Sequence, residues 1–291
     1  CDDAYRKALA DLVQETGLEV CVELGGFRMN DGIKKYGDQA GEQAALFEQK
    51  KLEPWLKTPG ARLDTITTDH SMMWFIREMT PEQVERMVQE HLDYIEAMQK
   101  WRPGLKVGFI ESLGYFWFKG KNGKQYKQTD VGYPRFDFEE FMTGVMKEAK
   151  KRGIEIDHFD IDHGFWGATM DTLGFGKSME WRQAEQIDYG RFLEAERVCR
   201  KLGLKVGVTF NDTLWDRLYF EKGGCKTPED ADRECALRCV EFIKGYFAAG
   251  GRPDRLCFQS WTTYPTQTGP ENRPDSFMGT TLRQLNAIKR R

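Results

Sequence analysis

The sequence predicts an α/β protein of the TIM-type (β/α) barrel class, from its length, its strand spacing and its loops. The chain has 291 residues, and a barrel of this class takes about 250. Six short β-type runs begin at residues 19, 62, 105, 154, 204 and 255. Long loops rich in aromatic and polar residues follow these runs. We expect a single domain, residues 1–291. Because a closed barrel needs eight strands and only six are evident, the barrel can be incomplete or atypical.

The expected strands are short runs of β-forming residues between polar or glycine-containing segments. They are Glu19–Leu24, Arg62–Thr68, Leu105–Ile110, Ile154–Ile161, Leu204–Phe210 and Arg255–Ser260. A further segment, residues 115–129, predicts a β-hairpin excursion that turns at Asn122 and Gly123. An open, doubly wound sheet is the competing architecture, but no GxGxxG or GxxxxGKS/T motif follows any strand. The repeat of strand, loop, helix and tight turn therefore favours the barrel class.

Capping residues and glycines mark the helices. Thr80 precedes the helical pattern Pro81–Trp101, and Gln83 completes a capping box. Thr227 precedes the pattern Pro228–Ala249, which ends at paired glycines. The other helical patterns are Asp3–Gln14, Phe138–Lys151, Asp188–Lys201 and Asp275–Lys289.

Strand alternation predicts which side chains enter the barrel. Successive side chains lie on opposite faces of a strand, and the face toward the helices should be apolar. Phe159 and Ile161 therefore face outward, and His158 faces inward. The same argument predicts a polar ring at the strand ends: Glu23, Asp69 or His70, Glu111, Asp160, Asp162, Asn211, Gln259 and Trp261. Barrel enzymes draw their catalytic groups from these ends, although a polar residue at one strand end can also serve only to cap a helix.

Aromatic residues gather after the strands. The chain has 8 Trp, 10 Tyr and 19 Phe, and flat aromatic faces beside carboxylates and amides suit sugar rings. Packing of loops onto the barrel accounts for part of this set. The side chains expected to contact a carbohydrate are Glu23, Asp69, His70, Trp117, His163, Trp166, Asn211, Trp215, Gln259 and Trp261.

The carboxylates of the ring predict acid/base chemistry. Two carboxyl groups that flank a glycosidic bond are sufficient for its hydrolysis. Glu111 follows the apolar run VGFI, a setting that favours a general acid. Asp160 or Asp162, among polar neighbours, is then the nucleophile or base, with Glu23 in reserve. No cofactor and no metal ion is expected in this reading.

The strand ends resemble those of the glycoside-hydrolase superfamily of TIM barrels. The likeness rests on VELGGFR, TTDHSMMW, FIESLGYFWF, FDIDHGFWG, TFNDTLW and FQSWTTYP, and it identifies no single family. Chitinase-type hydrolases carry the strand motif DxxDxDxE. Asp157, Asp160 and Asp162 match its first three positions, but Gly164 stands where the catalytic Glu belongs. The resemblance implies a barrel that hydrolyses a poly- or oligosaccharide.

Two other functions stay open. A ring of carboxylates, amides and imidazoles could hold Mg²⁺ or Mn²⁺, as in sugar isomerase or epimerase barrels. His70 and His163 would then be the telling ligands. The second alternative is a glycan-binding barrel whose catalytic pair is disabled, which Gly164 favours.

Composition bears on partners and on location. The chain has 43 Lys and Arg against 46 Asp and Glu, and this balance argues against a nucleic-acid-binding surface. No apolar run approaches the roughly 18 to 20 residues of a membrane span. Cys1 followed by Asp2 and Asp3 resembles the mature start of a bacterial lipoprotein. We therefore expect a secreted, periplasmic or lipid-anchored protein, an arbitrary chain start being the alternative.

The seven cysteines do not form a disulfide scaffold. Cys21 and Cys257 lie in strand patterns and are expected to be buried thiols. Cys225, Cys235 and Cys239 are close enough in sequence for one disulfide in an exported protein, whereas two packed thiols on one helix are the alternative.

Overall fold

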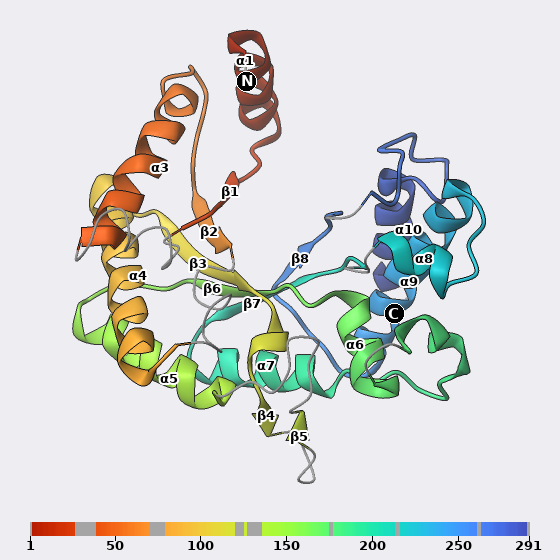
Figure 1. Ribbon diagram of the computed structural model, residues 1–291. Helices are drawn as coiled ribbons and strands as arrows, with labels where there is room; N and C mark the ends of the chain where they lie inside the picture. The colour runs from red at the N-terminus through yellow and green to blue at the C-terminus, as the bar shows by residue number, and fades with distance from the viewer. Residues whose placement is uncertain are drawn as a thin grey trace. The chain divides into compact units, whose positions relative to one another are not determined.

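Six strands form one sheet in the order in which they follow along the chain (Figure 1). The computed structural model describes residues 2–26, 39–69, 79–119, 125–126, 136–174, 177–212, 216–260 and 263–289. The strands of this sheet are β1 (Cys21–Leu24), β2 (Thr65–Asp69), β3 (Lys106–Glu111), β6 (His158–Ile161), β7 (Lys205–Thr209) and β8 (Arg255–Cys257). Strand β1 pairs with β2, β2 with β3 and β7 with β8, each time in parallel.

This strand order decides between the two architectures that the sequence left open. The order β1-β2-β3-β6-β7-β8 has no reversal, whereas a doubly wound sheet reverses at its switch point. A sheet wound in one direction is that of a TIM-type barrel. The described residues contribute six strands to it, so the prediction of an incomplete barrel of this class is confirmed.

The helices lie between the strands. They are α1 (Asp3–Thr16), α3 (Ala40–Leu56), α4 (Pro81–Trp101), α5 (Phe138–Lys151), α6 (Gly164–Leu173), α7 (Gly190–Lys201), α8 (Asp216–Glu221), α9 (Pro228–Ala248) and α10 (Phe277–Lys289), with short 3-10 turns η3 (Leu113–Tyr115) and η5 (Ser178–Gln183). The expected capping box at Thr80 and the expected cap at Thr227 both form: the Thr80 hydroxyl accepts from the Gln83 amide at 3.3 Å, and the Thr227 hydroxyl accepts from the Asp230 amide at 3.2 Å. None of these helices is long and apolar enough to cross a membrane, as far as the described part of the chain goes.

The expected hairpin excursion is present as a two-stranded antiparallel sheet of β4 (Phe118–Lys119) and β5 (Gln125–Tyr126) (Figure 1). Its expected turn at Asn122 and Gly123 lies outside the described residues. Strand β4 continues from a segment that Arg191 of α7 holds in place. The buried Arg191 guanidinium donates to the carbonyls of Leu113 and Phe116, both at 3.2 Å.

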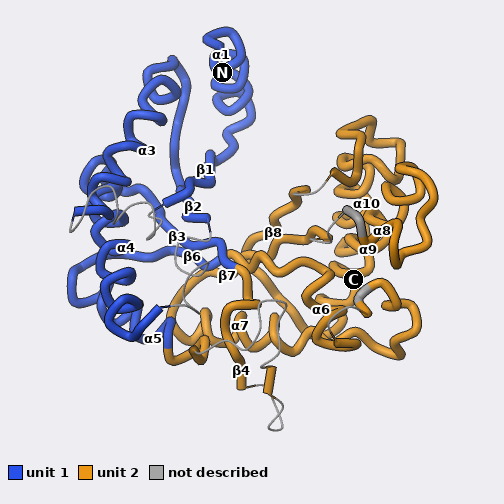
Figure 2. Tube along the Cα trace, viewed as in Figure 1, with its two compact units in different colours: residues 1–111, 141–159 blue, residues 112–140, 160–291 orange. Residues whose placement is uncertain are grey.

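Two compact units divide the chain (Figure 2). Unit 1 comprises residues 1–111 and 141–159, and unit 2 comprises residues 112–140 and 160–291. The boundaries fall at the end of β3, within α5 and within β6, and each unit is described by itself below. The expectation of a single domain stays a prediction.

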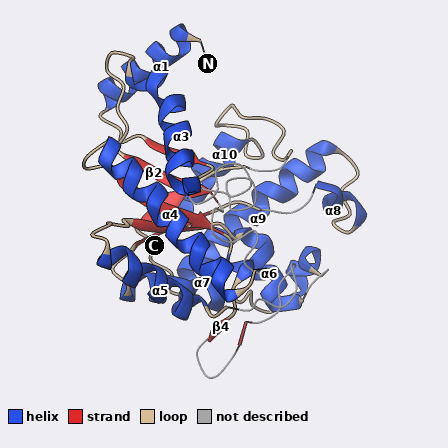
Figure 3. Ribbon diagram, turned by 60° about the vertical axis from the view of Figure 1, so that its left-hand side comes forward, coloured by secondary structure: helices blue, strands red, loops and turns tan. Residues whose placement is uncertain are grey.

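In unit 1, helix α4 covers the outer face of β2 and β3 (Figure 3). The Thr68 hydroxyl lies 3.3 Å from His91 Nε2 of α4, and the His91 ring lies 5.3 Å from that of Phe109. On the opposite face the Thr67 hydroxyl lies 2.9 Å from His158 Nε2. Side-chain alternation along β2 therefore holds, with Thr68 toward the helix and Thr67 away from it.

In unit 2, aromatic rings fill the space between the sheet and helix α9. The Phe210 ring, directly after β7, lies 5.0 Å from Phe242 and 5.8 Å from Tyr246 of that helix. Because successive side chains lie on opposite faces of a strand, positions 207 and 209 of β7 face away from the helices.

The cysteines correct one expectation and decide another. Cys21 is exposed, not buried, because it lies on β1 at the edge of the sheet. Cys257 is half-buried. Cys225, Cys235 and Cys239 are free thiols, and all three pack in or against one apolar cluster. The packed-thiol interpretation therefore holds in this structure.

Candidate active site at the ends of strands β6, β7 and β8

In unit 2, an ion pair lies on the inward face of the sheet. Asp160 of β6 forms an ion pair with Arg255 of β8, whose Nη1 lies 3.3 Å from Asp160 Oδ2. Between these two strands lies Gly207 of β7, the register partner of Arg255. A Cβ atom on Gly207 would collide with the Asp160 carboxylate. Glycine at position 207 therefore leaves the space that the Asp160 carboxylate needs to reach the Arg255 guanidinium.

Further along the strands, alternation places two more layers of polar residues on the same face as this ion pair. Thr209 and Cys257 are register partners two residues beyond Gly207 and Arg255, and Asp162 follows Asp160 by two. Two residues further come Asn211 and Gln259; the Cys257 thiol lies 3.4 Å from Gln259 Oε1. The stacked set, which we call the strand-end cluster, consists of Asp162, Thr209, Asn211 and Gln259.

Three residues of the strand-end cluster are buried and Gln259 is half-buried, and the cluster is only partly hydrogen-bonded. Asp162 is 6 % exposed, Asn211 3 % and Thr209 0 %. Within the described residues, no partner exists for Asn211 Nδ2, Asn211 Oδ1, Thr209 Oγ1 or Gln259 Nε2. Each buried polar group without a partner costs about 1 to 3 kcal/mol, and native proteins keep such groups few. Several of them side by side on neighbouring strands indicate a site built to bind a polar ligand.

Asp212 follows the cluster and belongs to a buried network that sequence reasoning missed. Its Oδ2 accepts from the Tyr219 hydroxyl at 2.8 Å and from Arg238 Nε at 2.5 Å. Burial, and then the Asp212 charge, hold the pKa of Tyr219 well above its ordinary value. The Arg238 guanidinium lies over the Phe165 ring at 4.9 Å. The one available signal is a charged Arg238 within an otherwise apolar stretch of α9.

His163 packs on the helix side of the sheet, away from the strand-end cluster. Its ring lies against Gly167 of α6, where a Cβ would overlap it, and 5.6 Å from the Phe192 ring of α7. Its Nδ1 lies 3.2 Å from the Ser112 hydroxyl. Burial, and secondarily the charge of Arg191, hold the pKa of His163 well below its ordinary value. His163 is therefore a neutral imidazole that packs between helices α6 and α7.

The two expected sugar-binding tryptophans that the structure describes have packing partners. Trp166 lies against the apolar cluster that contains Met179 and Tyr264. Lys119 Nζ lies 4.9 Å from the Trp117 ring centroid. The other two, Trp215 and Trp261, lie outside the described residues, as does His70.

In unit 1, Glu111 lies on the side of β3 that was not expected. The His158 ring occupies the space beside Gly108, so Gly108 marks the inward face of β3. Phe109 contacts His91 of α4 and marks the opposite face. Alternation places Glu111, which is 0 % exposed, with Phe109.

Glu23 and Asp69 lie on the inward face of unit 1. Glu23 is the register partner of Thr67, and Asp69 follows Thr67 by two residues on β2. Since Thr67 contacts His158, alternation assigns Asp69 to the same face, a point that the sequence left undecided. Over the part of the chain that the structure describes, no three His, Cys, Asp or Glu side chains gather closely enough to hold a metal ion.

Comparison with known proteins gives similarity of fold alone. No protein-family model matches the chain. No curated protein sequence matches it. Among solved structures, the GH53 catalytic domain of Ignisphaera aggregans matches 90 % of this chain and 68 % of its own, at 12 % identity and a TM-score of 0.47. A glucosidase from Croceicoccus marinus matches 88 % of this chain at 11 % identity and a TM-score of 0.46.

A third match is xylanase 10C from Cellvibrio japonicus, over 96 % of this chain at 12 % identity and a TM-score of 0.45. The chain spans about half the length of two of these proteins, 45 % of the glucosidase and 52 % of the xylanase.

Proposed function

We propose that this chain is a carbohydrate-active enzyme, a glycoside hydrolase that cleaves a poly- or oligosaccharide by carboxylate chemistry. The observation that carries the proposal is the strand-end cluster of unit 2. It combines a buried carboxylate, Asp162, with the amides of Asn211 and Gln259. Both polar atoms of the Asn211 amide and Nε2 of Gln259 lack partners among the described residues. Amides that offer both donors and acceptors match sugar hydroxyls, which also donate and accept.

The three expected catalytic carboxylates have different settings. Asp160 is engaged by Arg255 at 3.3 Å, so we assign it to holding β6 and β8 together beneath the cluster. Asp162 is one level nearer the strand ends, next to the unpartnered amides, and we assign it the role of nucleophile or base. Glu111 belongs to unit 1 and lies with Phe109 on the face of β3 toward α4, so we do not retain it as the general acid.

The test is the release of sugars from a panel of neutral and acidic polysaccharides and oligosaccharides. Loss of a positioned acid or base lowers the rate by about 100-fold or more. We expect Asp162→Asn to lose turnover to this extent while it still binds the glycan. Full turnover by Asp162→Asn would remove the assignment of Asp162. Glu111→Gln should keep full turnover, and a folded Glu111→Gln variant that loses turnover would contradict the placement of Glu111 away from the site.

Three results contradict a hydrolase. The first is the absence of product from every glycan of the panel. The second is glycan binding without turnover, which favours a carbohydrate-binding barrel. The third is activity on a free sugar that EDTA abolishes and Mn²⁺ or Mg²⁺ restores, which favours an isomerase or epimerase.

A further inference from the structure

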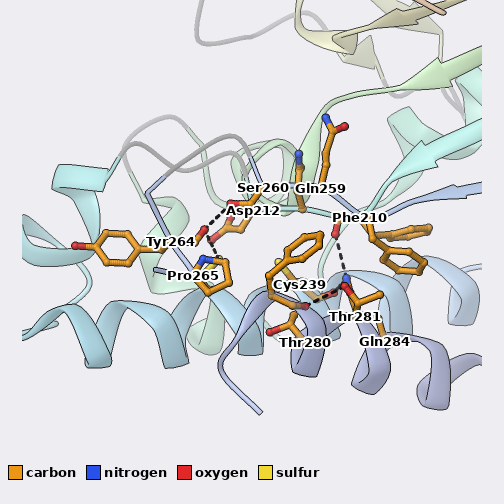
Figure 4. A pocket seen from close by; sticks show the side chains of 14 residues that line it. Phe210, Asp212, Cys239, Gln259, Ser260, Tyr264, Pro265, Thr280, Thr281 and Gln284 are labelled. Carbon is orange, nitrogen blue, oxygen red and sulfur yellow. Dashed lines mark hydrogen bonds between the residues drawn. The ribbon is translucent and has the colours of Figure 1, made fainter. Parts of the chain in front are cut away.

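The chain at Asn211 is held in place by hydrogen bonds to three neighbouring elements. The Phe210 amide donates to the Cys257 carbonyl at 2.8 Å, which continues the pairing of β7 with β8. The Asn211 carbonyl accepts from the Phe165 amide of α6 at 2.9 Å. Gln284 Nε2 of α10 donates to the Phe210 carbonyl at 3.0 Å (Figure 4). All of these residues belong to unit 2, and together they fix the end of β7.

The side chains of Asn211 and Gln259 lie on the inward face of the sheet. The Phe210 ring marks the helix side, because it packs on α9, and Asn211 is the next residue along the chain. Gln259 follows Cys257 by two residues, as Asn211 follows Thr209, the register partner of Cys257. Figure 4 shows the Gln259 side chain pointing away from α10. Asn211 and Gln259 are therefore neighbours on one face.

The Asn211 amide is buried with both of its polar atoms unpartnered in the described chain. Asn211 is 3 % exposed, and neither Nδ2 nor Oδ1 has a hydrogen-bond partner there. Gln259 differs, because the Cys257 thiol donates to its Oε1 at 3.4 Å, and Nε2 alone lacks a partner among the same residues. Thr209, two residues before Asn211, adds a buried hydroxyl on the same face. A buried amide with both atoms unpaired is costly unless a ligand uses them.

We infer that the Asn211 amide binds two adjacent hydroxyl groups of one sugar ring, an inference that rests on the proposed function. The oxygen and the nitrogen of an amide lie side by side, one as acceptor and the other as donor. Adjacent ring hydroxyls also lie side by side, and each donates as well as accepts. One hydroxyl donates to Asn211 Oδ1, and its neighbour accepts from Asn211 Nδ2. Gln259 Nε2 supplies a second donor to the same pair.

Other ligand classes fit this pattern less well. A carboxylate or a phosphate offers acceptors alone, so it leaves Asn211 Oδ1 unpaired and meets the Asp162 carboxylate on neighbouring β6 with like charge. A metal ion uses the amide oxygen and not the nitrogen. A lone hydroxyl pairs with one atom of the amide and leaves the other buried and unpaired. The substrate class is therefore a sugar unit with two free, adjacent hydroxyls, without an acetamido group or a further linkage at either carbon.

The first test uses nuclear magnetic resonance and two ring probes that differ by one hydroxyl. The Asn211 side-chain amide signals are identified by their loss in Asn211→Leu, or in Asn211→Asp if the apolar variant does not fold. We expect the cis or the trans isomer of vicinal cyclohexanediol to shift these signals saturably. Cyclohexanol, the same ring with a single hydroxyl, should leave them in place at equal concentration.

Two internal controls accompany this test. The Gln284 amide, which is bound to two carbonyls, should keep its signals in place with either probe. Thr281→Val should keep the full response of Asn211 to the diol, because the Thr281 hydroxyl bonds within α10. Asn211 signals that move with neither diol isomer, or that move equally with cyclohexanol, overturn the inference.

The second test separates this inference from the proposed function. With a series of monodeoxy analogues of a glycan that the enzyme cleaves, we expect two adjacent positions at which loss of the hydroxyl lowers kcat/KM about tenfold or more. In Asn211→Leu the loss at these positions should be much smaller, because the amide that the deoxy carbon leaves unpaired is gone.

The outcomes of the two tests are distinguishable. Equal losses in the parent protein and in Asn211→Leu, or no such pair of positions, overturn the diol site and leave the hydrolase standing. A saturable response to the diol without product from any glycan supports the diol site and overturns the hydrolase. Folding of each variant is checked by its urea unfolding curve.

Discussion

The carboxylate of Asp160 occupies the space that a side chain on Gly207 would fill. Asp160 lies on β6 and Gly207 on the neighbouring strand β7, and the carboxylate passes Gly207 to reach Arg255 on β8. The backbone of Gly207 is not in the left-handed region, so the demand for glycine here comes from space and not from conformation.

We expect Gly207→Ala to destabilise the protein by about 1 to 3 kcal/mol, the usual cost of overpacking. Either the Asp160 carboxylate moves away from Arg255 or the two strands separate. Gly144→Ala is the matched control, because Gly144 lies within α5 and a Cβ there meets nothing within 4 Å. That change should be stabilising by up to about 1 kcal/mol. Urea unfolding of both variants checks the contrast, and equal stabilities for the two would contradict it.

Asp160 and Asp162 are expected to separate into a structural and a functional carboxylate. Asp160→Asn weakens a bond to a charged group, and we expect a loss of stability of about 1 to 3 kcal/mol. Arg255→Met should cost a similar amount, and the double variant less than the sum of the two, since the residues are paired. Asp162→Asn should instead keep the unfolding midpoint and lose turnover. A midpoint lowered by Asp162→Asn as far as by Asp160→Asn would refute this division.

Strand alternation predicted the placement of side chains correctly wherever one face of a strand was clearly apolar. Phe159 and Phe210 marked the outer faces of β6 and β7, so the opposite placement of Asp160 and Gly207 followed from the sequence. Alternation did not decide the inward face of β3, where both faces are apolar. The contact that marks its inward face, between Gly108 and the His158 ring, joins strands far apart in the chain.

Two kinds of feature could not be predicted from the sequence: a long-range ion pair and helices without a side-chain cap. Arg238 binds Asp212 across 26 residues, and nothing in the local pattern of either residue indicates the other. Helix α3 was not predicted because it lacks a side-chain cap at its start and has Pro54 in its last turn. Helix α6 likewise begins without a side-chain cap, at His163.

The buried ion pair of Arg191 and Asp171 should behave as one unit. Their side chains are 0 % and 3 % exposed, and two bonds of 2.8 and 2.9 Å join them. Removing one partner leaves the other charge buried, which costs about 3 to 5 kcal/mol. We expect this loss for Arg191→Leu and for Asp171→Leu, and a smaller one than their sum for the double variant. A double-mutant cycle by urea unfolding measures the coupling, and strict additivity would argue against the pair.

The same Arg191 holds the segment before the hairpin through the carbonyls of Leu113 and Phe116. Arg191→Lys keeps the charge but lacks the planar fork that reaches both carbonyls and Asp171 together. We expect faster proteolytic cleavage near residues 113–119 in Arg191→Lys than in the parent protein. Cleavage at the parental rate would indicate that the fork is not what anchors this segment.

Buried His91 should make the protein less stable as the pH falls. Burial lowers the pKa of His91 from 6.5 to about 3, so the folded state holds the imidazole neutral while the unfolded state takes up a proton. Stability is therefore full above pH 6.5 and is lost between pH 6.5 and about 3. Between pH 7 and pH 5 this amounts to about 2 kcal/mol for one such histidine.

Urea unfolding at pH 7 and pH 5 checks this, with His91→Gln as the comparison. The variant should show a pH dependence smaller by about 2 kcal/mol, because it has no imidazole to protonate in the unfolded chain. Its absolute stability can differ at both pH values without affecting this difference, since the His91 contact to Thr68 is lost at each. The matching observation on the folded protein is a His91 ring signal that does not titrate from pH 8 to pH 5. Titration of that ring near pH 6.5 would contradict a neutral, buried His91.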